Sequence, residues 1–161
     1  MKMLEVTVDG HPLHPALVAV PIGAWIASFV FDIASHLVGD PGFLVTGARW
    51  LIGIGVLGAV AAALAGVLDL LTLRAGTRVF RVAVTHMAIN GTVVVAYAIG
   101  FLWRATSDQA GGEPVGWGPL ALSAASLAGL TAGGYLGGEL AYRYGVRVAA
   151  EAIQQHTKEG S

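Results

Sequence analysis

The stretch HPLHPALVAVPIGAWIASFVFDIASHL, residues 11–37, decides the fold, because from Pro15 to Leu37 it contains one formally charged residue, Asp32. A helix needs about 20 apolar residues to cross a hydrocarbon core of ~30 Å. Three later stretches also meet this length, at residues 49–73, 79–103 and 117–144. Turn-rich segments separate the four stretches. The sequence therefore predicts an all-α, integral membrane, up-down four-helix bundle, formed by residues 1–161 as one transmembrane domain with short tails.

The amino-acid composition is typical of a protein that is surrounded by lipid rather than by water. The chain is 55% hydrophobic and only 12% charged, with a mean hydropathy of +0.70, whereas soluble domains carry about 25% charged residues. The absence of cysteine excludes iron–sulphur clusters, and the net charge of −1 disfavours a nucleic-acid partner. We also expect no nucleotide cofactor.

The positive charges are distributed unequally between the two ends of the predicted bundle. The end that holds both termini carries seven of them: Lys2, Arg74, Arg78, Arg81, Arg143, Arg147 and Lys158. The opposite end carries only Arg49 and Arg104. The positive-inside rule therefore predicts that both termini are cytoplasmic.

Each predicted helix carries one stripe of polar residues when it is drawn at 100° per residue. In the first helix the stripe contains His14, Trp25, Asp32 and His36. The stripe of the second helix contains Asp69. The third helix contributes His86 and Asn90, and the fourth contributes Glu139 and Arg143. At the end near the termini, these stripes place four groups at one depth: His14, Asp69, His86 with Asn90, and Glu139. Because ionisable groups in the bilayer are costly unless they are paired or bound, this convergence predicts a polar site.

The sequence leaves several readings of this site open. His14 and His86 suit axial ligation of one b-type haem, with Asp69, Asn90, Glu139 and Arg143 as orienting groups or alternative ligands. A divalent metal held by His11, His14, His86 and the two carboxylates is a second reading. A purely structural network that locks the bundle is the alternative from a different class, and proton or ion transport through the outer pair Asp32 and His36 is a third.

Prolines and glycines add two further expectations. In HPLHP, Pro12 and Pro15 predict a stiff, extended approach that leaves His14 near the helix cap. A ridge of small residues at Ala125, Gly129, Gly133 and Gly137 predicts close helix contact, either within the chain or in a homo-oligomer. No convincing internal repeat is evident.

The segments HPLHPALVAVPIG, GVLDLL, THMAIN and LGGELAYRYGVRV together resemble the bacterial membrane proteins classed as domain of unknown function 2231, from Gly10 to about Val148. The resemblance implies four helices in the bacterial cytoplasmic membrane and, since some relatives carry a Rieske domain, a Rieske or cytochrome subunit as redox partner. The chain departs from the family pattern at Tyr144, where a histidine is expected. We therefore expect a binding or electron-transfer subunit more than a stand-alone enzyme.

Overall fold

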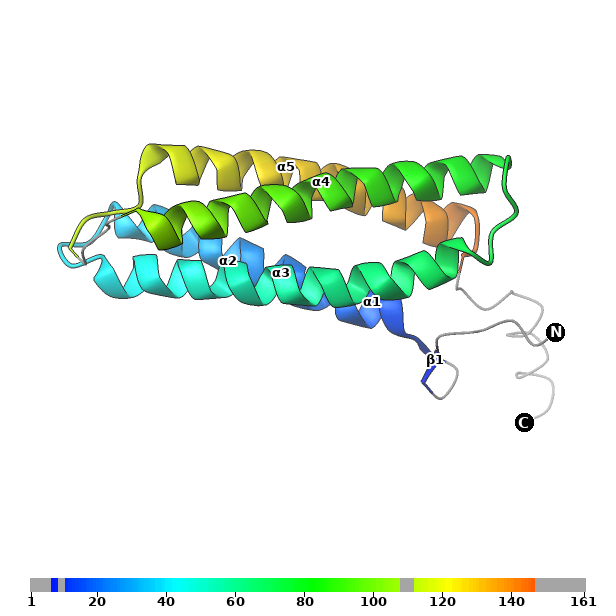
Figure 1. Ribbon diagram of the computed structural model, residues 1–161, viewed down its shortest axis with the longest axis horizontal. Coiled ribbons are helices and arrows are strands. Elements are labelled where there is room, and N and C mark those ends of the chain that lie inside the picture. Colours follow the sequence, from blue (N-terminus) through cyan, green and yellow to red (C-terminus); the bar gives the residue numbers. More distant parts are fainter. Residues whose placement is uncertain (1–6, 9–10, 108–111, 147–161) are drawn as a thin grey trace.

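The computed structural model describes residues 7–8, 11–107 and 112–146, and Figure 1 shows them as a bundle of long helices. The elements in chain order are β1 (Thr7–Val8), β2 (His11–Pro12), α1 (Leu13–Leu17), α2 (Ala19–Ser35), α3 (Gly42–Leu70), α4 (Arg78–Thr106), α5 (Trp117–Gly138) and the π-helical turn η1 (Glu139–Arg143). The two short strands pair antiparallel.

The four membrane-spanning helices that hydropathy predicts are confirmed. Four continuous segments are long and apolar enough to cross a bilayer: His14–Ser35, Gly42–Leu70, Arg78–Thr106 and Trp117–Arg143. Large apolar side chains such as Leu57 and Val95 point outward and are exposed. A lipid bilayer would cover these exposed apolar side chains, so the bundle is suited to a membrane environment.

Several helix boundaries differ from the prediction, and two of the differences change which residues lie in a helix. The segment from Gly42 to Ala48 is apolar and joins α3, which begins seven residues before the predicted start at residue 49. At its far end α4 continues to Thr106 and so takes in Arg104, which the prediction left in a loop.

The approach to the first span is extended only as far as Pro12. Helix α1 begins at Leu13 and places His14 in its first turn. The helix is interrupted at Val18, and α2 starts at Ala19. Because Pro21 has no N–H to donate to the carbonyl of Leu17, it accounts for this break.

The bundle consists of two helical hairpins. One hairpin is formed by α1, α2 and α3 and the other by α4 and α5, and contacts within each hairpin are denser than those between them. Helix α1 and the α3–α4 connection lie at one end of the bundle (Figure 1), which we call the terminal end; the α2–α3 and α4–α5 connections lie at the other, which we call the loop end.

The two hairpins repeat one another along the chain. Three pairs of residues meet across the bundle, and the members of each pair are 72 positions apart: 14 with 86, 25 with 97, and 32 with 104. The imidazoles of His14 and His86 lie 6.4 Å apart between ring centroids. The rings of the pair at 25 and 97 stack at 4.1 Å, and a salt bridge of 2.8 Å joins the pair at 32 and 104.

The partner helices α3 and α5 follow the same repeat with an offset of 71. Trp25 donates its indole N–H to the carbonyl of Ile52, and Tyr97 donates its hydroxyl to the carbonyl of Ser123. The two acceptors, at 52 and 123, are equivalent under this offset. The hairpins are thus related by an approximate twofold axis along the bundle, and the three pairs of residues lie across it.

Candidate functional site: the paired histidines

His14 is held against α3 by a backbone carbonyl and a glycine. Its Nδ1 lies 2.8 Å from the carbonyl oxygen of Ala62. A Cβ atom added at Gly66, one turn further along α3, would come within 3.2 Å of the imidazole carbon Cε1. The small residue at this position therefore makes room for the ring, and the carbonyl fixes its orientation.

His86 is held against α5 in the same way. Its Nδ1 lies 2.8 Å from the carbonyl oxygen of Gly133, and a Cβ at Gly137 would come within 3.0 Å of its Cε1. The glycine ridge predicted for close contact thus packs on α4 of the same chain. Asn90 adds one contact without a counterpart in the first hairpin: its Nδ2 donates to the carbonyl of His86 and lies 3.3 Å from the His86 Nδ1.

These hydrogen bonds determine the tautomer of both rings. A carbonyl oxygen can only accept, so the 2.8 Å contacts place the proton on Nδ1 of His14 and of His86. The 3.3 Å approach of Asn90 Nδ2 to the His86 Nδ1 is then a contact between two donors and not a hydrogen bond. The lone pair of a neutral imidazole is then on Nε2. Within the described residues neither Nε2 atom has a hydrogen-bond partner. Each histidine therefore presents the nitrogen that metals bind, with its other nitrogen fixed by a backbone carbonyl.

The spacing of the two rings suits two ligands of one metal. A metal–imidazole bond is about 2.0–2.1 Å, and a ring centroid lies about 1.2 Å behind its nitrogen, so two imidazoles on opposite sides of one metal have centroids about 6.4 Å apart. The observed separation is 6.4 Å, with the ring planes at 77°.

The interior near the histidines is lined by small side chains. The buried apolar residues on this side of the Trp25–Tyr97 stack are Pro21, Ala24, Ala59, Ala62, Ala65, Ala83 and Val93. The fully buried large side chains among the described residues lie in the stack or nearer the loop end, and Trp25, Tyr97 and Ile52 are the largest. The larger apolar side chains on this side, such as Leu127 and Leu130, are only partly buried and pack against the core cluster.

The other residues predicted for this site lie around the histidine pair without contributing a ligand cluster. Glu139 pairs with Arg143 at 3.0 Å, as the sequence analysis expected of a structural network. Asp69 is half-buried near the end of α3. The side chain of His11 lies outside the described part of the structure. Within residues 7–8, 11–107 and 112–146, no group of three or more histidine and carboxylate side chains is placed to hold a metal ion, which leaves the multi-ligand metal reading without support.

The loop end holds a buried ion pair that the sequence analysis did not identify. Arg104 of α4 donates from Nη2 to Oδ2 of Asp32 at 2.8 Å, and the two side chains are 2% and 0% exposed. The same nitrogen donates to the carbonyl of Pro119 and the hydroxyl of Ser123 on α5. The carboxylate predicted to pair with His36 therefore joins α2 to α4 and, through Arg104, to α5.

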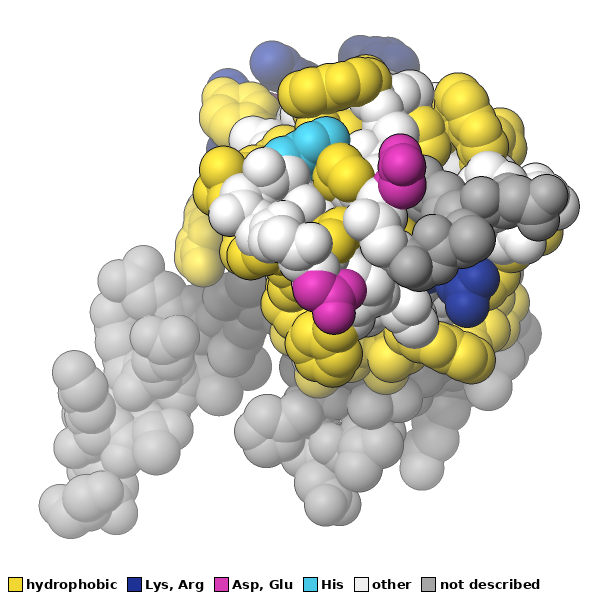
Figure 2. Space-filling model, turned by 90° about the vertical axis from the view of Figure 1, so that its left-hand side faces the viewer, with side chains coloured by type: hydrophobic (Ala, Val, Ile, Leu, Met, Phe, Trp, Pro, Cys, Tyr) yellow, Lys and Arg dark blue, Asp and Glu magenta, His cyan; other side chains and the backbone are white. Residues whose placement is uncertain are grey.

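Two contacts close the loop end over this ion pair. Ser35 accepts a hydrogen bond from the backbone N–H of Val115, which is itself buried, and His36 stacks on Trp117 at 4.7 Å. Figure 2 shows this face of the molecule, where the charged side chains are few and separate from one another and hydrophobic side chains surround the rim.

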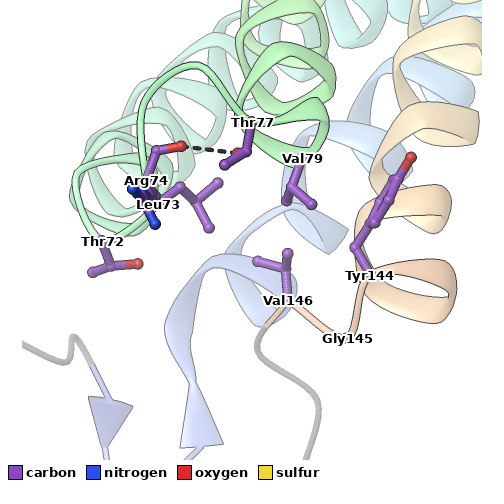
Figure 3. Close-up of a pocket in the computed structure, with 8 residues that line it drawn as sticks. All are labelled: Thr72, Leu73, Arg74, Thr77, Val79, Tyr144, Gly145 and Val146. Carbon is purple, nitrogen blue, oxygen red and sulfur yellow. Dashed lines mark hydrogen bonds between the residues drawn. The ribbon is translucent and has the colours of Figure 1, made fainter.

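A shallow pocket of about 410 Å³ lies at the terminal end, between the α3–α4 turn and the segment after η1. Figure 3 shows Val79 and Val146 facing each other across it, with Tyr144 to one side and Thr77 bonded to the carbonyl of Arg74. Tyr144, at the position where the sequence analysis expected a histidine, lines this surface pocket.

The comparisons with known proteins identify a family. The family model described as "Predicted membrane protein (DUF2231)" matches residues 10–150, and the chain belongs to this family. No curated protein and no solved structure matches it.

Proposed function

We propose that this member of the DUF2231 family binds one b-type haem at the terminal end of the bundle, with His14 and His86 as the two axial ligands, and acts in membrane electron transfer. The observation that carries the proposal is the matched presentation of the two imidazoles. Their ring centroids lie 6.4 Å apart. Each ring has its Nδ1 bonded to a backbone carbonyl, which leaves its Nε2 available to bind a metal.

The approximate twofold axis supports a single shared ligand. His14 and His86 occupy equivalent positions of the two hairpins, as do the carbonyls of Ala62 and Gly133 that orient them. A group that lies on the axis between two equivalent histidines meets the same ligand from both sides. Metal and cofactor sites of four-helix bundles are commonly built in this way, from side chains on facing helices.

The number of available ligands favours haem over a bare metal ion. A zinc site is usually completed by four ligands, and no group of three or more histidine and carboxylate side chains occurs among the described residues. Haem supplies four nitrogens of its own, so two histidines complete its iron.

The chemistry that follows from two histidine ligands is electron transfer. Haem iron with both axial positions filled by histidine leaves no coordination position for oxygen or a substrate, and it changes its charge by one electron. The charge bias of the sequence supports placing this site on the cytoplasmic side of a bacterial membrane, where a Rieske or cytochrome subunit is the kind of partner that would exchange electrons with it.

The experiment that tests the proposal is an oxidised and dithionite-reduced absorption spectrum of the detergent-purified protein, with elemental analysis of the same sample. We expect a Soret band that sharpens on reduction, about one iron per chain, and loss of the band in His14→Ala and in His86→Ala. His36→Ala is the matched control, because it removes a histidine at the opposite end of the bundle and should leave the spectrum unchanged.

Two results would overturn the proposal. One is a Soret band that persists in the double variant His14→Ala/His86→Ala, which would place the haem elsewhere. The other is a stable, colourless protein in a host that supplies haem. If that protein carried stoichiometric copper or zinc, the histidine pair would be a metal site of another kind; if it carried no metal, the two imidazoles would be hydrogen-bonded links between helices.

A further inference from the structure

Four polar atoms at the loop end are buried without a hydrogen-bond partner among the described residues: Oδ1 of Asp32, Nε and Nη1 of Arg104, and Nε2 of His36. Asp32 and Arg104 are 0% and 4% exposed. Their direct bond uses only one atom of each group, Oδ2 and Nη2. One oxygen of the Asp32 carboxylate and two nitrogens of the Arg104 guanidinium therefore still need a hydrogen-bond partner.

Buried polar groups in proteins nearly always have a partner, either protein or ordered water. The unpaired atoms require a molecule that both donates and accepts, because Oδ1 of Asp32 accepts while Nε and Nη1 of Arg104 donate. Water has this property, and a buried water makes about three hydrogen bonds to such groups. An apolar molecule or a bare cation would leave the guanidinium nitrogens unpaired.

The surroundings limit the size of this partner and the direction from which it arrives. On the outer side, Val115 is 1% exposed and its N–H bonds to Ser35, so the α4–α5 connection covers the ion pair. On the inner side, the stacked rings of Trp25 and Tyr97, each 1% exposed, close the interior. Among the polar groups of this site His36 is the most exposed: it is half-buried, whereas Asp32, Arg104 and Ser123 are buried.

We propose that the loop end holds a buried water site formed by Asp32, Arg104 and His36, through which protons of the solvent reach the ion pair but do not pass the Trp25–Tyr97 layer. The ionisable groups around this site are Asp32 of α2, His36 directly after α2, and Arg104 and Tyr97 of α4. Helix α5 supplies the hydroxyl of Ser123 and the carbonyl of Pro119. The site lies at the opposite end from the histidine pair and is independent of haem binding.

The experiment is hydrogen–deuterium exchange of the ¹⁵N-labelled protein in detergent micelles, followed by NMR. The Nε–H of Arg104, assigned by its loss in Arg104→Lys, should exchange within the first minutes in D₂O. The indole N–H of Trp25 is the internal control, because it is buried and bonded to the carbonyl of Ile52. We expect the Trp25 signal to persist at least about tenfold longer. Equal protection of the two signals would mean a dry ion pair and would overturn the proposal.

A pair of variants tests the part of His36. In His36→Leu we expect the exchange of the Arg104 Nε–H to slow by about tenfold or more, since an apolar side chain replaces the outer polar group of the site. Asp40→Asn, an exposed change in the α2–α3 connection four residues after His36, should leave the rate unchanged. An unaltered Trp25 signal in both variants shows that the bundle is folded. An unchanged Arg104 rate in His36→Leu would remove His36 from the site and overturn the proposed route.

Discussion

The approximate twofold axis predicts the outcome of exchanging the charges of Asp32 and Arg104. The two residues occupy equivalent positions of the hairpins and form a buried pair at 2.8 Å. Each single reversal, Asp32→Arg or Arg104→Asp, places two like charges in a buried site. The double variant Asp32→Arg/Arg104→Asp places the opposite charges in contact again, with the helices that carry them interchanged.

The expected magnitudes follow from the burial of the pair. Removing one partner of a buried ion pair costs about 3–5 kcal/mol. A single reversal adds repulsion of about 4 kcal/mol, taken for two charges ~4 Å apart at an effective dielectric of ~20. The double variant should recover most of this loss. It should remain about 1.5–3 kcal/mol less stable than the wild type, because the carbonyl oxygen of Pro119, which can only accept a hydrogen bond, then lies beside a carboxylate instead of the guanidinium.

The assay is unfolding in mixed micelles with increasing dodecyl sulphate, followed by tryptophan fluorescence and far-ultraviolet circular dichroism. The conservative variants Asp32→Asn and Arg104→Met give the cost of removing one partner without repulsion. The reasoning would be refuted if the double variant were as unstable as the worse single reversal, or if both single reversals lay within about 1 kcal/mol of the wild type.

Two further predictions concern glycines that face aromatic rings. A Cβ in Gly55→Ala would collide with the indole of Trp25, so this variant should lose about 1–3 kcal/mol in the same unfolding assay. Gly91→Ala, which has open space around it, should be neutral or slightly more stable, and equal losses in the two variants would contradict the packing described. In Gly66→Ala and Gly137→Ala the new methyl group presses on an imidazole that we propose as a haem ligand. The haem content per chain should therefore fall while the far-ultraviolet circular dichroism is unchanged. Undiminished haem in both variants would contradict the proposed site.

The fold was largely predictable because hydropathy and helix length are strong signals in membrane proteins. The apolar runs predicted four spans, and the periodicity of 100° per residue placed Trp25, Asp32 and His86 on inward-facing stripes. The pairing of Asp32 with Arg104 was missed for a specific reason. The predicted helix ended at Trp103, three residues before the observed end at Thr106, so Arg104 was counted as a charge of the loop.

The internal repeat was not recognisable from sequence similarity. Residues 14–32 and 86–104 are identical at only 4 of 19 positions, and two of the three pairs that meet across the axis differ in residue type. The available signal was spacing: Trp25 lies 11 positions after His14, and Tyr97 lies 11 positions after His86. The backbone carbonyls that orient the imidazoles could not be predicted at all, because every residue has a carbonyl. The sequence analysis expected side chains in that role.

The most direct test of the central claim is a haem titration of the purified, haem-free wild-type protein in detergent. The arrangement of His14 and His86 predicts saturation at one haem per chain, with the spectrum of a low-spin iron that carries two histidines. A spectral change that never saturates, or one that reaches the same end point in His14→Ala/His86→Ala, would contradict the claim that these two histidines form a haem site.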